Sequence, residues 1–328
     1  MERILITGVC GFIGYHTAIR FLQEGFNVVG IDNLNSHYDP MLKYKRLEIL
    51  NNNFKNNFRF FKIDITKKHL VENLFKKEKY KIVVNLAARA GVRNSLIKPL
   101  IYYKTNVIGV LNLLESIKKY SPETLFIHSS SSSVYGNNRK VPFSEDNKVD
   151  NPISPYAASK KASEELCYTY FYLYNINMLV FRFFTVYGPY GRPDMAYFKF
   201  IKLIAENKPI HLYGDGTQKR DFTYVDDIVN GIYKGRNFRG FEIINLGNNT
   251  PIKINKLINI IETKLNRKAR IINSDLPPED MKITYANIEK AKKILNWKPE
   301  IKIEDGIDIT IKWYIKNQNW LEKIKLNN

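Results

Sequence analysis

The sequence contains little cysteine, with Cys10 and Cys167 as the two thiols among its 328 residues. Both lie in segments that we predict to be interior, so we expect no disulfide framework and a reducing, cytoplasmic location. No apolar run is long enough to cross a bilayer, and we predict no membrane partner. The N-terminus enters a strand-like segment directly after Met1-Glu2-Arg3, without the basic and apolar regions of a signal peptide.

Acidic residues are scarce relative to basic ones: 32 Asp and Glu face 51 Lys and Arg, which gives a formal net charge of +19. A clustered basic surface is typical of nucleic-acid binding. Here the lysines are spread along a chain that is rich in Lys, Asn and Ile throughout, so we interpret the charge as compositional drift. We therefore predict no nucleic-acid partner, although such a charge can attract an anionic small substrate.

Short β-rich runs alternate with helical patterns in the first half of the chain. The expected strands are residues 3–7, 27–31, 58–62, 82–86, 125–128 and 178–183, and the clearest expected helices are 17–24, 100–119 and 154–174. Strands that are apolar on both faces and alternate with helices indicate a parallel sheet covered by helices on both sides. We predict an α/β fold with a doubly wound parallel sheet.

The pattern changes after about residue 184. Residues 185–194 are rich in Gly and Pro and predict a loop, after which expected helices (196–206, 254–265, 288–295) mix with a short strand (241–246). No repeat or low-complexity linker separates the two parts. We predict a first domain over residues 1–183, to which the chain returns near 211–247, and a smaller C-terminal mixed α/β substrate-binding lobe over 184–328.

Three glycines, Gly8, Gly11 and Gly14, directly follow the first expected strand and open a helix. An ordinary βα turn does not need three glycines at this spacing, because each one costs conformational entropy. Glycine lets the backbone approach a pyrophosphate, and a helix N-terminus offers it free N–H groups. We therefore predict a Rossmann-type dinucleotide site here, with Phe12 and Ile13 in the same turn.

Asp32 ends the second expected strand. A carboxylate at this point accepts hydrogen bonds from the adenosine ribose and repels a 2′-phosphate, which predicts NAD rather than NADP. The alternative is that Asp32 only caps the following segment. The further cofactor contacts that we predict lie at the ends of the second, third and fourth strands: Asn33, Asp64, Ile65, Leu86, Ala87 and Ala88.

Tyr156 and Lys160 are spaced i and i+4 in an expected helix, so they share one face. A nearby ammonium lowers the pKa of a tyrosine from about 10 and makes it a usable general base. The spacing alone is common by chance. Upstream, however, five consecutive serines (residues 129–133) stand at a strand end before Val-Tyr-Gly, where they would supply hydroxyl donors to a polar substrate.

Together these motifs resemble the extended short-chain dehydrogenase/reductase family, and within it the nucleotide-sugar epimerases. The resemblance covers essentially the whole chain and includes the runs 182–189 (RFFTVYGP) and 220–227 (RDFTYVDD). It implies a tightly bound NAD, and a Tyr156 that takes the proton of the sugar 4-hydroxyl while the C4 hydride passes to NAD and later returns to the other face. It also implies that Ser131 shares this hydrogen bond and that Lys160 and Asn106 contact the cofactor.

Two relatives on the same scaffold carry carboxylates before Val-Tyr-Gly: an Asp-Glu pair in 4,6-dehydratases and a Glu in uronate decarboxylases. This chain has Ser132 and Ser133 there, which favours an epimerase. Thr185 and the runs 191–196 and 90–93 resemble UDP-glucuronate 4-epimerases, which produce precursors for polysaccharide biosynthesis. The resemblance implies that Arg192 pairs with the uronate carboxylate, assisted by the hydroxyls of Ser132, Ser133 and Thr185. This grip would protect the 4-keto intermediate, a β-keto acid, against loss of CO₂. The alternative for Arg192 is contact with the diphosphate.

The resemblance also implies substrate contacts by Arg93, Tyr213, Arg220 and Asp280. The chain departs from the subgroup at two places. Before Asp280 it has residues 277–279 (PPE), whereas the subgroup usually has a Gly directly before the aspartate and a Gln two residues before that Gly. It also has Arg89 at a position that is often Gln. Relatives form homodimers through two helices, here residues 100–119 and 154–174. The alternatives are a UDP-glucose or UDP-N-acetylglucosamine 4-epimerase and a non-catalytic NAD- or RNA-binding protein. We predict no metal site.

Overall fold

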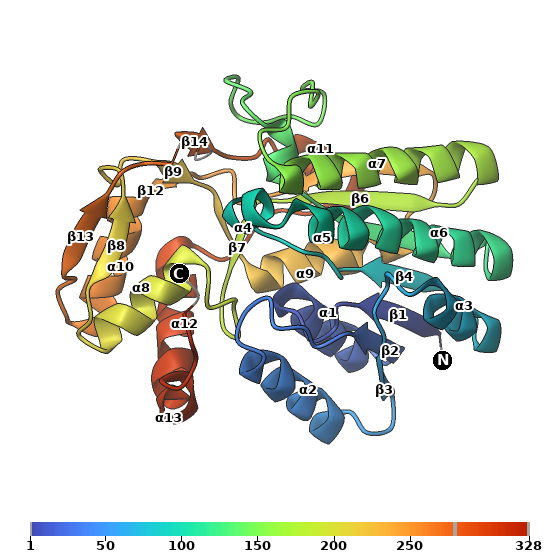
Figure 1. Ribbon diagram of the computed structural model, residues 1–328, viewed down its shortest axis with the longest axis horizontal. Coiled ribbons are helices and arrows are strands. Elements are labelled where there is room, and N and C mark those ends of the chain that lie inside the picture. Colours follow the sequence, from blue (N-terminus) through green and yellow to red (C-terminus); the bar gives the residue numbers. More distant parts are fainter. Residues whose placement is uncertain (1, 278–280, 327–328) are drawn as a thin grey trace.

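The structure, a computed structural model, describes residues 2–277 and 281–326. Its main feature is a seven-stranded sheet in the order β11-β6-β5-β4-β1-β2-β3, in which all neighbours are parallel (Figure 1). The strands are β1 (Arg3–Thr7), β2 (Asn27–Asp32), β3 (Phe58–Lys62), β4 (Ile82–Asn85), β5 (Leu125–Ser131), β6 (Met178–Phe183) and β11 (Phe241–Leu246). The chain reverses its direction across the sheet between β1 and β4, where ligands bind in sheets of this kind. The predicted doubly wound parallel sheet is confirmed.

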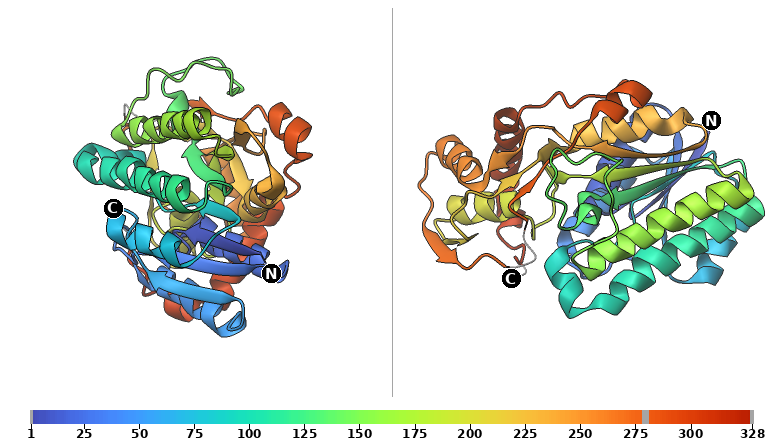
Figure 2. Two further views of the ribbon diagram at one scale, coloured as in Figure 1. Left: turned by 90° about the vertical axis from the view of Figure 1, so that its right-hand side faces the viewer. Right: turned by 90° about the horizontal axis from the view of Figure 1, so that it is seen from above.

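Helices cover both faces of this sheet (Figure 2). One face carries α1 (Phe12–Gln23), α2 (Met41–Asn53) and α9 (Val225–Lys234), and the other carries α3 (Lys68–Lys77), α6 (Gly109–Tyr120) and α7 (Pro155–Tyr174). Side chains alternate along each strand, so Ile4 and Ile6 join the core of the first face and Leu5 joins that of the second. The central strands are therefore apolar on both sides.

The predicted helix 100–119 is nearly continuous but contains a π-helical turn. It consists of α5 (Pro99–Tyr103), the π turn Lys104–Ile108 and α6, and a short α4 (Val92–Ile97) precedes it. The strand predicted at residues 58–62 is confirmed as β3, but the expectation that it is covered on both faces is wrong, because Phe58 is buried whereas Phe61 is 39% exposed. The reason is that β3 forms the edge of the sheet. Helices α2 and α3 are missing from the sequence-based prediction.

The smaller lobe lies at the left of Figure 1, beyond the carboxyl ends of the large sheet. It contains α8 (Ala196–Ala205), β8 (Ile210–Tyr213), β9 (Lys219–Arg220), β12 (Ile252–Lys253), α10 (Ile254–Leu265), β13 (Ile271–Ser274), β14 (Ile283–Thr284), α12 (Ile303–Lys316) and α13 (Gln318–Leu321). β8 pairs with β13, while β9 lies between β12 and β14. No helix in the described ranges is long and apolar enough to span a membrane.

The two parts of the molecule are connected by several crossings of the chain. β7 (Thr185–Tyr187) pairs with β10 (Phe222–Tyr224), and the loop prediction for residues 185–194 therefore misses a short strand. α9 then packs against α1, and β11 pairs with β6 at the edge of the large sheet, before α11 (Glu289–Leu295). The chain thus returns to the large sheet at α9 and β11, whereas β8 belongs to the smaller lobe.

Candidate active site

The glycine turn between β1 and α1 has little space for side chains. Gly8 has a φ of +67°, and a Cβ on it would lie 2.7 Å from the backbone nitrogen of Ala87. A Cβ on Gly14 would collide with the carbonyl oxygen of Gly8, to which the Gly11 N–H donates at 2.8 Å. The helix begins at Phe12 with no side-chain cap. Its first N–H groups, at Phe12 and Ile13, are therefore available to a diphosphate beside β4.

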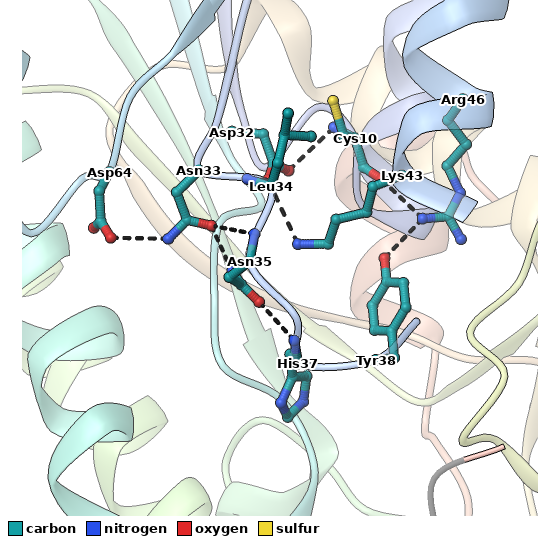
Figure 3. Close-up of polar contacts among 10 residues, drawn as sticks. All are labelled: Cys10, Asp32, Asn33, Leu34, Asn35, His37, Tyr38, Lys43, Arg46 and Asp64. Atoms are coloured by element: carbon teal, nitrogen blue, oxygen red, sulfur yellow. Dashed lines mark hydrogen bonds and ion pairs between the residues drawn. The ribbon is translucent and has the colours of Figure 1, made fainter. Parts of the chain in front are cut away.

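Asp32, at the end of β2, is 6% exposed and accepts hydrogen bonds from the N–H groups of Cys10 (3.2 Å) and Leu34 (2.8 Å) (Figure 3). The ammonium of Lys43, on α2, is also buried and lies 3.5 Å from the same carboxylate. Lys43 is not among the predicted site residues. Its ammonium places a positive charge against the carboxylate that is predicted to bind the adenosine ribose.

Asn33 and Asp64 meet at the ends of β2 and β3, where the Asn33 amide donates to the Asp64 carboxylate at 2.8 Å (Figure 3). Partial burial raises the pKa of Asp64, but hydrogen bonds from Asn33 and Thr66 outweigh it and leave that pKa below its ordinary value. Ile65 is buried and would be struck by a side chain at Gly109. Asp32, Asn33 and Asp64 thus form one polar edge.

The end of β4 lies directly beside the glycine turn. The Leu86 N–H donates to the Thr7 carbonyl (3.2 Å) and the Ala87 N–H to the Thr7 hydroxyl (3.1 Å), which fixes the small residues Ala87 and Ala88 beside the glycine turn.

Asn106 lies in the π turn and is 1% exposed. Its amide oxygen accepts the Arg89 N–H at 2.8 Å, and its amide nitrogen donates to the Arg89 carbonyl and the Ser159 hydroxyl, both at 2.9 Å. Its amide therefore holds the loop after β4 in place. Burial lowers the pKa of Arg89, and the neighbouring Tyr102 and Asp64 oppose this effect.

The catalytic candidates come from β5 and α7. Ser154 caps α7 by accepting the Ala157 N–H at 3.1 Å, and Pro155 occupies the first turn. The helix places Tyr156 and Lys160 on the face toward β5, where both are buried. Ser131 hydrogen-bonds the Tyr156 hydroxyl, and the Lys160 ammonium donates to the Ser129 carbonyl at 2.5 Å. The structure therefore brings the three predicted catalytic residues together.

The prediction that Lys160 lowers the pKa of Tyr156 is wrong in this structure. Burial raises the pKa of Tyr156 above its ordinary value, while the Ser131 hydrogen bond and the charge of Arg192 oppose that rise. Lys160 directs its ammonium to Ser129 instead. Burial also lowers the pKa of Lys160 to about 8, although Glu164 and Cys167 act in the opposite direction.

A buried ion pair between Glu164 and Arg182, which is not among the predicted features, lies next to Lys160. Glu164 follows Lys160 by one helical turn and accepts two hydrogen bonds from Arg182 of β6, at 2.9 and 2.8 Å. It also accepts the Ser130 hydroxyl at 2.5 Å. The expectation that all five serines serve the substrate is therefore wrong for Ser130, because its hydroxyl attaches β5 to α7. The i+4 spacing from Lys160 is the signal that would have identified Glu164.

The residues that are predicted to contact the sugar lie in the turn after β5, at the start of β7 and in the loop that follows β7. Ser132 and Ser133 form a 3₁₀ turn after β5, and the Ser131 hydroxyl donates to that of Ser133 at 3.1 Å. Thr185 begins β7, and its N–H donates to the carbonyl of Asp221 at 3.0 Å.

The guanidinium of Arg192 forms an ion pair with Asp194 through two bonds: Nε donates to Oδ1 at 3.0 Å, and Nη2 donates to Oδ2. It also reaches the Ala90 carbonyl at 3.4 Å. Asp194 is not among the predicted residues. One edge of the Arg192 guanidinium is therefore already bound to a carboxylate of the protein.

The predicted nucleotide contacts are spread over both parts of the molecule. Arg93, on α4, lies with its guanidinium 4.0 Å from the ring centre of Tyr213, on β8, and so connects the large domain to the smaller lobe. Arg220, on β9, donates to the carbonyl of Lys219 at 3.0 Å. Asp280 and the departures at Pro278 and Glu279 lie outside the described residues.

Comparisons with known proteins agree with this geometry. The family model described as GDP-mannose 4,6 dehydratase matches residues 5–310. A UDP-glucuronate 4-epimerase of Thermodesulfobacterium geofontis is 48% identical over 99% of this chain and 100% of its own length. The structure of a UDP-glucuronic acid 4-epimerase from Bacillus cereus, in complex with UDP-glucuronic acid and NAD, is 34% identical with a TM-score of 0.90, covering 96% of this chain and all of that one. A UDP-glucose 4-epimerase from Thermotoga maritima with UDP-glucose is 29% identical with a TM-score of 0.89, covering 97% of this chain and all of that one. The chain belongs to the extended short-chain dehydrogenase/reductase family, among the nucleotide-sugar epimerases similar to UDP-glucuronate 4-epimerase.

Proposed function

We propose that this protein inverts C4 of a UDP-sugar through a 4-keto intermediate, interconverting UDP-glucuronate and UDP-galacturonate with a resident NAD. The observation that carries the proposal is the composition of the site around Tyr156. The charge of Arg192 acts on its phenol, Ser131 hydrogen-bonds it, and the two following positions are serines rather than the acids of a dehydratase. Such a site can hold a carboxylate and move one proton, but it lacks an acid for elimination at Ser132 and Ser133.

The residues of the first domain fit NAD. The glycine turn is so tight that a Cβ at Gly8 or Gly14 would collide with the neighbouring backbone, and Asp32 stands at the end of the second strand to accept ribose hydroxyls. The N–H groups at the start of α1 would hold the diphosphate, and Lys160 would hold the nicotinamide ribose. NAD supplies a hydride acceptor when it is bound.

The protein's own contribution to the reaction is to hold and move a proton. Tyr156 accepts the proton of the sugar 4-hydroxyl and returns it after the sugar has turned over, and Ser131 fixes the phenol and the sugar oxygen in line. Burial lowers the pKa of Lys160 to about 8, so its ammonium is largely protonated at neutral pH, and the Ser129 carbonyl holds it in place to bind the nicotinamide ribose. Burial of Tyr156, Lys160 and Ser131 keeps bulk water from the keto sugar.

The carboxylate of a uronate must be held in one orientation at the 4-keto stage, because the 4-keto uronate is a β-keto acid that can lose CO₂. If the C5–C6 bond breaks, CO₂ leaves, the electron pair forms the enolate of the 4-ketone, and a proton from water at C5 gives a 4-keto pentose while the cofactor stays reduced. Arg192, with Ser132, Ser133 and Thr185, would hold the carboxylate in the plane that disfavours this cleavage. Asp194 orients the guanidinium by binding its Nε and Nη2 atoms.

A second candidate is a 4-epimerase of a neutral UDP-hexose, such as UDP-glucose or UDP-N-acetylglucosamine. The Arg192–Asp194 pair favours it, because Asp194 already compensates the charge of Arg192. The two candidates differ in substrate and share the chemistry of Tyr156.

We expect the purified protein to convert UDP-glucuronate into UDP-galacturonate without added NAD, because the cofactor is reoxidised within each turnover. Proton NMR of the anomeric region measures the conversion, with UDP-glucose and UDP-N-acetylglucosamine in parallel reactions. Turnover of the neutral sugars alone would establish the second candidate. If the protein, reconstituted with NAD, converts none of the three sugars, the proposal is wrong.

We further propose that two copies pair through the predicted helices 100–119 and 154–174, together with α4. Apolar side chains on these elements are exposed in the single chain: Leu96, Ile97, Leu100, Tyr103, Ile108, Tyr168 and Tyr172. An exposed apolar surface of this kind marks an interaction site on a soluble protein. A symmetric pair would bury it from both sides.

Replacing Leu100, which is 75% exposed, with Glu should convert the dimer into a monomer, because the substitution places paired charges in an apolar interface. Size-exclusion chromatography with light scattering measures the mass. Ile309→Glu, at an exposed site on α12, is the matched control and should remain dimeric. A monomeric wild-type protein, or a dimeric Leu100→Glu variant, would contradict this interface.

A further inference from the structure

Arg46, on α2, is a fully buried cation that hydrogen-bonds neutral oxygens. Its Nη1 atom donates to the Cys10 carbonyl at 2.8 Å and to the Tyr38 hydroxyl at 2.7 Å (Figure 3). Its other nitrogens donate to the Tyr190 carbonyl, at 2.6 Å from Nη2 and 3.2 Å from Nε, and Nη2 also reaches the Gly191 carbonyl at 3.3 Å. A single side chain thus joins α2 to two segments that are far from it in the sequence, the turn at Cys10 and the loop at Tyr190.

Burying a guanidinium is costly, and folds usually offset the cost with a carboxylate. The five hydrogen bonds of Arg46 go instead to backbone carbonyls and one phenol. These oxygens belong to the cofactor turn at Cys10 and to the loop that begins at Tyr190. Each N–H donor of the planar Arg46 guanidinium meets an acceptor. The geometry of the guanidinium therefore fixes the position of these two segments relative to each other.

The second of these segments has little freedom of its own. Tyr190 has a φ of +55°, a region that non-glycine residues rarely adopt. A side chain at Gly191 would collide with the Tyr197 hydroxyl. Arg192 follows directly, with its guanidinium at Asp194 and the Ala90 carbonyl. Two of the three carbonyls that Arg46 binds therefore belong to the residues immediately before Arg192.

We propose that Arg46 is a positioning residue that couples the cofactor turn to Arg192, so that the uronate carboxylate is held in register with the cofactor. The inference rests on the proposed role of Arg192. It implies that Arg46 contributes to recognition of the carboxylate while leaving the nucleotide contacts proposed for Tyr213 on β8 and Arg220 on β9 largely unaffected.

The test compares Arg46→Met with Lys45→Met, a substitution of the neighbouring residue, which pairs with Glu48 on the surface of the same helix. In the NAD-loaded enzyme we expect the affinity for UDP-glucuronate to fall by about tenfold in Arg46→Met. The affinity for UDP should change by less than about threefold. Calorimetry measures both affinities. NMR, together with trapping of the released CO₂, measures how turnover divides between C4 inversion and loss of CO₂. The share that loses CO₂ should rise in Arg46→Met.

Equal loss of affinity for UDP and UDP-glucuronate, or an unchanged product ratio, would show that Arg46 only stabilises the fold and would overturn the inference. If Arg46→Met does not fold, Arg46→Lys replaces it, because lysine keeps the charge but cannot reproduce the fork. The same comparison of ligands then decides. A wild-type protein that does not convert UDP-glucuronate would refute the proposed function itself, independently of any Arg46 variant.

Discussion

The Tyr156→Phe variant should lose C4 inversion, with kcat reduced by about 10³-fold, while it still binds NAD and UDP-glucuronate. The substitution removes the oxygen that hydrogen-bonds Ser131 and retains a ring of nearly the same volume in a site that is 9% exposed. Because the proton of the 4-hydroxyl then has no acceptor, the first oxidation stops. NMR of the product and single-turnover absorbance of the reduced cofactor both measure the loss.

Tyr102→Phe is the matched control for this variant. The ring of Tyr102 lies edge-on to that of Tyr156 at 6.1 Å, but its own hydroxyl faces the Ala90 carbonyl at 3.4 Å. Loss of that weak contact should change kcat by less than about threefold. A Tyr156→Phe variant with more than a tenth of the wild-type rate would mean that another group accepts the proton.

Elements with a regular pattern could be predicted from the sequence, and helix α2 shows why others could not. Its buried residues are Leu42, Lys43, Arg46 and Leu50. Two of these four are cations, so the buried face has no continuous apolar stripe for a periodicity argument to detect. Both cations are buried because they meet partners from distant segments, Asp32 in one case and the carbonyls of Cys10 and Tyr190 in the other.

The sequence predicts which residues form the catalytic group, Tyr156, Lys160 and Ser131, but it does not predict their pKa values. The spacing of Tyr156 and Lys160 and the serines at the end of β5 bring the right residues together, because a helix face and a strand end are local properties. The pKa of Tyr156 depends on burial, which no short motif encodes, and the direction in which Lys160 points depends on the Ser129 carbonyl. Asp194 is a similar case, because an acid two residues after Arg192 becomes a partner only through the fold of the loop.

The second large effect concerns Arg192. Replacing it with Met should reduce kcat/KM for UDP-glucuronate by about 10²-fold or more, because one partner of a desolvated charge pair with the substrate is lost. Of the turnover that remains, a larger share should lose CO₂, since the carboxylate is no longer held in the plane that resists cleavage. Binding of UDP should persist, and the ratio of UDP-galacturonate to released CO₂ is the quantity to measure.

This variant leaves the partly buried carboxylate of Asp194 without its cation, and the repulsion of that charge weakens binding of any anion for reasons unrelated to recognition. The double variant Arg192→Met, Asp194→Asn removes that unpaired charge. If Arg192 binds the substrate carboxylate, the double variant should have the same low kcat/KM for UDP-glucuronate as Arg192→Met and should continue to release CO₂. The second substitution removes only the repulsion by the Asp194 carboxylate and does not restore the cation. If the double variant recovers the wild-type rate and product ratio, Arg192 serves to neutralise Asp194, and the carboxylate must be recognised by the hydroxyls of Ser132, Ser133 and Thr185.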